Sequence, residues 1–146
     1  MTTFNTQRSR TQPTLDNQHS TPMKSFLLAR GRSFGFAWNG LVALLRTQWN
    51  ARIHAVATAV VIIAGIVLDV SRTEWCLLVL AMGLVWAAEC INTAIEALAD
   101  TVSTAHHPGI GRAKDVAAGA VLVSAATAVV IGLMVLGPKL ARILGL

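Results

Sequence analysis

The sequence predicts an all-α membrane protein, with an amphipathic helix on the membrane surface followed by three transmembrane helices. Hydrophobic residues make up 54% of its 146 residues, charged residues only 13%, and the mean hydropathy is +0.60. This composition is too apolar for an ordinary soluble domain. Three apolar stretches approach or exceed the length that crosses about 30 Å of hydrocarbon: residues 53–70, 75–100 and 113–136. A soluble helical bundle, the alternative, needs polar outer faces, and residues 116–138 carry no charge.

The polar N-terminus is expected to be a disordered tail over residues 1–24, because it is rich in Thr, Gln, Asn and Ser and has no apolar run. The membrane domain is expected over residues 25–137, with a short tail at 138–146. Within it, a surface helix is predicted at about 33–48, where apolar residues recur at helical spacing: Phe34, Ala37, Trp38, Leu41 and Leu45. Packing of this helix on a soluble partner is the alternative.

Two local patterns support three antiparallel spans. Ser71 and Glu74 have the spacing of a capping box immediately before the second apolar run, which predicts a tight hairpin after the first span. On the third span a small residue recurs every fourth position, which lets helices approach closely in lipid: Ala120, Ser124, Ala128 and Gly132.

The positive charge is concentrated at the N-terminus. Seven of the twelve Lys and Arg residues precede the first span, and the turn after that span holds only Arg72. The positive-inside rule therefore predicts a multi-pass protein of the bacterial cytoplasmic membrane, with its N-terminus and the loop between the second and third spans in the cytoplasm. We interpret the basic segment as a feature of the membrane surface and expect no nucleic-acid partner.

Within the second span, Glu89, Asn92, Glu96 and Asp100 form a polar stripe. Offsets of three, seven and eleven residues from Glu89 point all four side chains in nearly the same direction. Ionisable groups at membrane depth are costly and usually functional. Because a chain with three spans has little interior in which to bury two glutamates, we expect it to form an oligomer.

The stripe suits proton abstraction from a hydroxyl combined with binding of a divalent cation. Glu89 is the deeper acid and is expected to act as general base, whereas Glu96 and Asp100 lie nearer the aqueous edge and are better placed for Mg²⁺. Lys114, after the following loop, could neutralise phosphate charge. A small oligomeric transporter coupled to protons or cations is the alternative, and a scaffold with paired acids is a third reading. A phosphate site needs Lys114 and Asp115, whereas a proton pathway does not.

The run from Glu89 to Asp100, followed by His107 and the triplet 113–115, closely resembles the prokaryotic diacylglycerol kinase family, which includes undecaprenol kinases. The pattern ExxNxxxExxxD followed by HxxxxxxAKD is long and specific. With the three spans, the resemblance covers roughly residues 30–136. Residues 91–96 and 113–122 look closer to the undecaprenol kinase branch.

The resemblance implies a homotrimer with active sites at its subunit interfaces on the cytoplasmic side. It also implies transfer of phosphate from ATP, with Mg²⁺, to a membrane lipid alcohol: diacylglycerol giving phosphatidic acid, or undecaprenol giving undecaprenyl phosphate. The implied catalytic residues are Glu89, as base, and Asn92. The residues implied near the ATP phosphates are Lys114, Asp115, Asp100 and His107.

The metal ligands implied by the resemblance are Glu96 and a second residue near the start of the segment 50–54. Family members are expected to carry a glutamate there, whereas this chain has Gln48. A glutamine oxygen can bind Mg²⁺ without a full charge, so affinity should be lower. Either Gln48 is a neutral ligand, or metal binding relies more on Glu96 and Asp100, or the activity is weak or altered.

Overall fold

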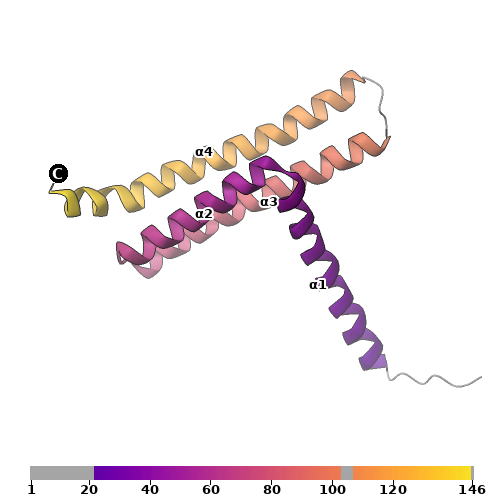
Figure 1. Ribbon diagram of the computed structural model, residues 1–146, viewed down its shortest axis with the longest axis horizontal. Coiled ribbons are helices and arrows are strands. Elements are labelled where there is room, and N and C mark those ends of the chain that lie inside the picture. Colours follow the sequence, from indigo (N-terminus) through magenta and orange to yellow (C-terminus); the bar gives the residue numbers. More distant parts are fainter. Residues whose placement is uncertain (1–21, 103–106, 146) are drawn as a thin grey trace, which may run out of the picture. The chain divides into compact units, whose positions relative to one another are not determined.

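The computed structural model describes residues 22–102 and 107–145, and all the regular structure within them is helical. The four helices are α1 (Pro22–Thr47), α2 (Trp49–Val67), α3 (Arg72–Val102) and α4 (Pro108–Leu144) (Figure 1). The last three are long and apolar enough to cross a membrane, which confirms the predicted all-α class with three spans. Most of the predicted tail, residues 1–21, lies outside the described residues.

The chain divides into two units that meet within α1, at Phe36 and Ala37. In the first unit, the described part of α1 begins at Pro22 rather than near residue 33. The expected start was set by where the apolar spacing begins. The helix itself begins earlier, because good helix formers such as Met, Leu, Ala and Arg precede that position. Large apolar side chains of this unit are exposed: Met23, Phe26, Phe34 and Phe36.

In the second unit, α1 ends at Thr47, and a short connection places Gln48 directly before α2. The Gln48 backbone N–H donates to the Leu44 carbonyl at 2.9 Å. From the first turn of α2, the Arg52 guanidinium donates to the carbonyls of Leu45 and Arg46, at 2.9 and 2.5 Å. These bonds satisfy carbonyls that a helix end leaves free and fix the backbone that carries the Gln48 side chain.

The α2–α3 hairpin contains the predicted capping box. The Ser71 N–H donates to Glu74 Oε2 at 2.6 Å, and the Glu74 N–H donates to Ser71 Oγ at 3.4 Å. Lys139 of α4 binds the same end of the unit: its Nζ lies 3.3 Å from Glu74 Oε2 and donates to the Asp69 carbonyl at 3.3 Å. Through Lys139, the far end of α4 is fixed to this hairpin.

Both ends of α4 extend beyond the predicted span of 113–136. At its start, His107 Nδ1 accepts a bond from the Gly109 N–H at 3.2 Å, and Pro108 occupies the first turn, where its missing N–H costs nothing. At its end the helix continues through Pro138 to Leu144 and ends at Gly145, whose φ of 71° is left-handed. Polar residues at both ends of α4 lower the local hydropathy, so the apolar stretch is shorter than the helix.

The helices α2, α3 and α4 lie side by side, and α3 makes its most extensive contacts with α4 (Figure 1). The hydrophobic core lies near the hairpin end, where Val70, Leu78 and Val135 are buried together. One polar bond crosses between helices within the apolar region, from Trp86 Nε1 of α3 to Thr58 Oγ1 of α2 at 3.0 Å. The hydrophobic core therefore stabilises the hairpin end of the three helices, which is the end opposite the polar stripe.

Candidate functional site

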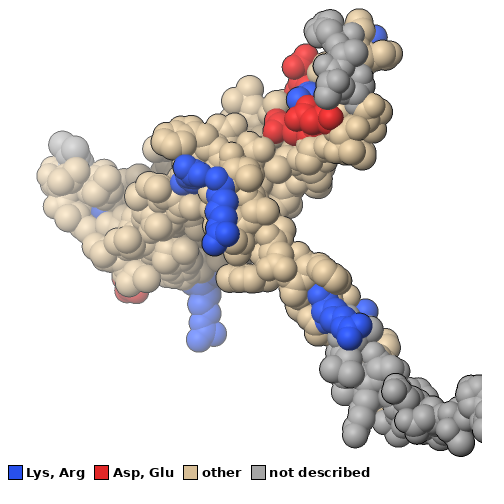
Figure 2. All heavy atoms as spheres, turned by 45° about the vertical axis from the view of Figure 1, so that its right-hand side comes forward, with Lys and Arg blue, Asp and Glu red and all other residues tan. Residues whose placement is uncertain are grey.

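The polar stripe of α3 is confirmed as a single helical face that passes from buried to exposed. Glu89 is 1% exposed and Asn92 5%, Glu96 is half-buried, and Asp100 is exposed. Figure 2 shows acidic side chains gathered where α3 ends and α4 begins. Packing of the neighbouring helices buries Glu89 within the single chain, whereas Glu96 is only half-buried, so the expected oligomer stays a prediction.

Glu96 lies at the centre of a three-residue cluster that joins α3 to the start of α2. Gln48 Nε2 donates to Glu96 Oε2 at 3.4 Å, and Asn92 Nδ2 donates to Glu96 Oε1 at 3.1 Å. Each carboxylate oxygen is thus oriented by an amide from a different side. The structure therefore brings together the two residues for which the resemblance implied metal binding, although they are 48 positions apart in the sequence.

The cluster suits Mg²⁺ only in part. Among the described residues, no three His, Cys, Asp or Glu side chains gather as a metal site. Mg²⁺ needs no such cage, because it commonly uses one or two carboxylates and completes its shell with water and substrate phosphates. Glu96 supplies one carboxylate, and Gln48 can supply an oxygen if its terminal amide turns over, since it now presents nitrogen to Glu96. The residues therefore fit a metal that is shared with a nucleotide.

The other expected phosphate-binding residues lie near the ends of α3 and α4. Lys114 Nζ forms an ion pair with Asp100 Oδ1 at 3.0 Å, so these two residues meet as expected. Asp115 is exposed, and no hydrogen bond or ion pair of its side chain is found within the described ranges. The His107 side chain caps α4, where its Nδ1 accepts the Gly109 N–H. Only Nε2 of His107 is left to meet a ligand.

Three buried polar atoms of the stripe have no hydrogen-bond partner in the part of the chain that the structure describes. They are Glu89 Oε2, Asn92 Oδ1 and Thr93 Oγ1. A buried polar group without a partner costs roughly 1–3 kcal/mol, so such groups are rare and are found where strain, catalysis, water or a bound ion accounts for them. Three of them within about 6 Å of helix rise indicate a site for a polar ligand. Thr93 was not among the residues expected at the site, although it directly follows Asn92 within the stripe.

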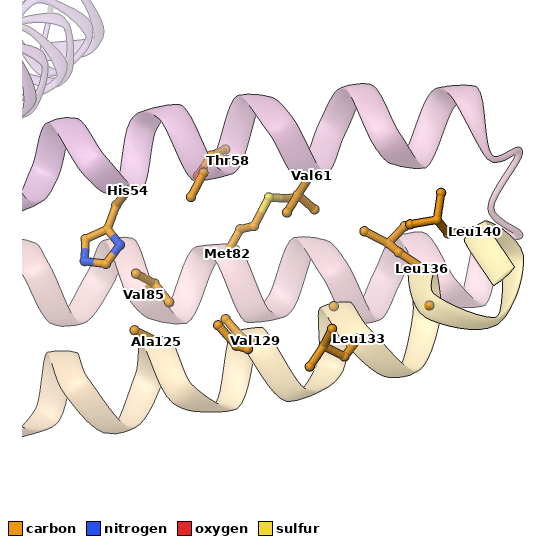
Figure 3. A pocket seen from close by; sticks show the side chains of 14 residues that line it. His54, Thr58, Val61, Met82, Val85, Ala125, Val129, Leu133, Leu136 and Leu140 are labelled. Carbon is orange, nitrogen blue, oxygen red and sulfur yellow. The ribbon is translucent and has the colours of Figure 1, made fainter. Parts of the chain in front are cut away.

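A second missed residue, His54, lies at one end of a cavity of about 450 Å³ between α2, α3 and α4. In Figure 3 its imidazole points from α2 into this cavity, and Leu136 and Leu140 lie at the opposite end. A lone histidine among apolar residues gives no motif, so only the packing of the helices could reveal it.

The chain matches a family of known proteins over most of its length. The family model described as prokaryotic diacylglycerol kinase matches residues 35–136. An undecaprenol kinase of Bacillus subtilis is 40% identical over 109 residues, which cover 75% of this chain and 89% of the relative. A diacylglycerol kinase of Synechocystis sp. is 40% identical over 109 residues (74% of this chain, 62% of the relative), and one of Escherichia coli is 33% identical over 99 residues (68% and 81%). The chain therefore belongs to the prokaryotic diacylglycerol kinase family.

Proposed function

We propose that this protein is a lipid kinase that transfers the γ-phosphate of ATP, with Mg²⁺, to the hydroxyl of a membrane lipid alcohol. The observation that carries the proposal is the buried Glu89 carboxylate, whose Oε2 has no protein partner among the described residues, one to two turns from the Gln48–Glu96–Asn92 cluster. A base and a cation site at this separation are what transfer to an alcohol requires. The acceptor is diacylglycerol or undecaprenol, the substrates in the relatives' names.

In the proposed reaction, Glu89 takes the proton of the lipid hydroxyl. The freed oxygen forms a bond to the γ-phosphorus, the bond from that phosphorus to the bridging oxygen breaks, and ADP leaves. The proton on Glu89 is then released to water before the next turnover. Asn92 holds the Glu96 carboxylate through its 3.1 Å bond and therefore acts as a positioning residue. Its buried Oδ1 remains available to the substrates.

Phosphate charge is balanced by groups at the aqueous end of the stripe. Mg²⁺ would be held by Glu96 and by Gln48 through its amide oxygen, and would neutralise charge on the ATP phosphates. Lys114 contributes a cation, and its contact with Asp100 at 3.0 Å keeps the ammonium group beside the stripe. We place His107 Nε2 and Asp115 near the phosphates on the strength of the resemblance.

The membrane placement follows from the same proposal. The lipid reaches Glu89 laterally within the membrane, whereas ATP arrives from the cytoplasm, so the stripe must cross the boundary between them. This places the N-terminus and the site on the cytoplasmic side of a bacterial inner membrane, with α1 at the membrane surface. We expect a homotrimer, in which a neighbouring copy completes each site. The kinase reading is favoured over a proton- or cation-coupled transporter because the chain belongs to a kinase family.

The test is phosphate transfer from radiolabelled ATP by the purified protein in mixed micelles containing Mg²⁺, with diacylglycerol and undecaprenol offered separately. Wild-type protein should label one of these lipids. Glu89→Gln should reduce the rate by about 10²–10⁴-fold, the typical contribution of a general base. Its assembly in size-exclusion chromatography should be unchanged, because an amide fills the same space. Transfer by Glu89→Gln at the wild-type rate would disprove the assigned base, and proton flux without use of ATP would favour a transporter.

A further inference from the structure

We propose that His54 is a positioning residue for the lipid acceptor. In this proposal the acceptor's hydrocarbon chain lies in the cavity between α2, α3 and α4, and the His54 imidazole hydrogen-bonds the acceptor's hydroxyl so that its oxygen meets Glu89. The inference rests on the proposed function and deepens it, because it assigns the path by which the acceptor reaches the base.

The first argument is the distribution of polarity along the cavity. Of its fourteen lining residues, His54 is the one ionisable residue, and Thr58 is the other with a polar side chain. The Thr58 hydroxyl already accepts a bond from Trp86 Nε1 at 3.0 Å. The rest of the lining is aliphatic side chains, Met82 and two glycines, and it extends to Leu136 and Leu140 at the far end (Figure 3). A cavity with one polar end and a long apolar body matches an amphiphile with a single polar head.

The second argument is the position of the polar end relative to the base. Val85 lines the cavity, and Glu89 follows it by four residues, so both lie on one face of α3 about one turn apart. In Figure 3, His54 and Val85 lie together at one end of the cavity, so the imidazole lies at the end nearest the base. The buried Oε2 of Glu89 has no partner within the described ranges. A hydroxyl at this end of the cavity would provide one.

The third argument concerns what can fill such a space. All three helices around the cavity are long and apolar enough to cross a membrane, and in a membrane hydrocarbon rather than water would surround them. No hydrogen bond to the His54 imidazole is found among residues 22–102 and 107–145, and an imidazole without partners in hydrocarbon is costly. A lipid alcohol satisfies both ends of the cavity at once. A helix from a second copy would fill the apolar body but leave His54 and Glu89 without a hydroxyl.

The test compares kinetic constants of full-length variants in mixed micelles, with lipid and ATP varied separately. His54→Ala should raise the KM for the lipid about tenfold, the effect of losing one hydrogen bond, and leave the KM for ATP unchanged. His54→Gln, which keeps a donor and an acceptor, should recover most of the loss. An unchanged lipid KM in His54→Ala, or an equal rise in the KM for ATP, would overturn the assignment.

A matched pair of variants tests the cavity itself. Ala128→Leu places a larger side chain in the lining, whereas Ala126→Leu makes the same change on α4 at a residue outside the lining. Only Ala128→Leu should raise the lipid KM. Equal effects of the two variants would refute the lipid pocket. So would an Ala128→Leu variant that changes the oligomeric size and leaves the lipid KM unaltered, because the cavity would then hold a second copy.

A binding measurement without ATP separates this proposal from the proposed function. Diacylglycerol and undecaprenol with brominated chains, each diluted into phosphatidylcholine nanodiscs, should quench Trp86 fluorescence in a saturable way, since Trp86 bonds Thr58 of the cavity wall. Trp86→Phe identifies the contribution of that residue. Saturable quenching that weakens in His54→Ala, with no phosphate transfer by wild-type protein, would support the pocket and reject the kinase. Transfer without saturable quenching would reject the pocket alone.

Discussion

The substitution Gln48→Glu tests the cation site most directly, because it restores the glutamate expected in the family at the residue that contacts Glu96. In the structure, Gln48 Nε2 lies 3.4 Å from Glu96 Oε2. The substitution would replace a donated hydrogen bond by two carboxylates at about this separation. Two unit charges 4 Å apart repel by about 4 kcal/mol at an effective dielectric constant near 20, an upper bound where solvent screens them. Without a cation, the variant should therefore unfold at a lower temperature than wild type.

A bound Mg²⁺ reverses this effect, because the two carboxylates then share a divalent charge. We expect the concentration of free Mg²⁺ that gives half-maximal phosphate transfer to fall roughly tenfold, equivalent to about 1.4 kcal/mol of binding free energy. Free Mg²⁺ is varied at fixed ATP, and thermal unfolding is recorded with and without Mg²⁺. The control is Thr47→Glu, which adds the same charge at an exposed neighbouring residue. If Gln48→Glu and Thr47→Glu give the same Mg²⁺ titration as wild type, Gln48 does not contact the metal.

Two further substitutions test the packing and the phosphate end of the site. Gly65→Ala would bring a Cβ to 2.7 Å from Trp75 Cη2, so it should lower the free energy of unfolding by the roughly 1–3 kcal/mol of an overpacked core, and the thermal unfolding midpoint with it. Gly83→Ala, where nothing lies within 4 Å, should leave the midpoint unchanged or raise it, and equal midpoints for the two variants would contradict this contact. Asp100→Asn should raise the KM for ATP severalfold through loss of the Lys114 contact, without a change in stability, because exposed pairs contribute about 0–1 kcal/mol. A lower KM for ATP would show instead that Asp100 competes with the phosphates.

The fold was largely predictable because hydropathy and helical period are local properties of the chain. Three spans, the capping box at Ser71 and the buried-to-exposed stripe from Glu89 to Asp100 all follow from such patterns. Helix ends were less predictable. Hydropathy reports whether a segment favours hydrocarbon, and α4 continues as a helix through Pro138 and Lys139 after that preference ends.

The site was predictable only where its residues share one helix. Glu89, Asn92 and Glu96 are linked by helical period, whereas the Gln48–Glu96 contact joins two helices and was implied only by the family resemblance. His54 and Thr93 were not found because neither residue belongs to a spacing pattern that by itself indicates a function. Their significance depends on which side chains of other helices they meet. Only tertiary packing supplies that information.

The polar stripe lies far along α3, so its depth in a membrane depends on the thickness of the bilayer. With α3 starting at Arg72 on one face of the membrane, Glu89 lies ~26 Å along the helix axis and Asp100 ~42 Å, at ~1.5 Å per residue. A hydrocarbon layer of about 30 Å therefore ends between them. In a thicker bilayer, Glu89 would lie farther from the polar boundary, and the Gln48–Glu96–Asn92 cluster would lie closer to hydrocarbon. In a thinner bilayer, Glu89 would be exposed to water. If Glu89 is the base of the proposed reaction, the chain length of the membrane lipids should therefore change the rate, because the start of α3 sets the depth of Glu89.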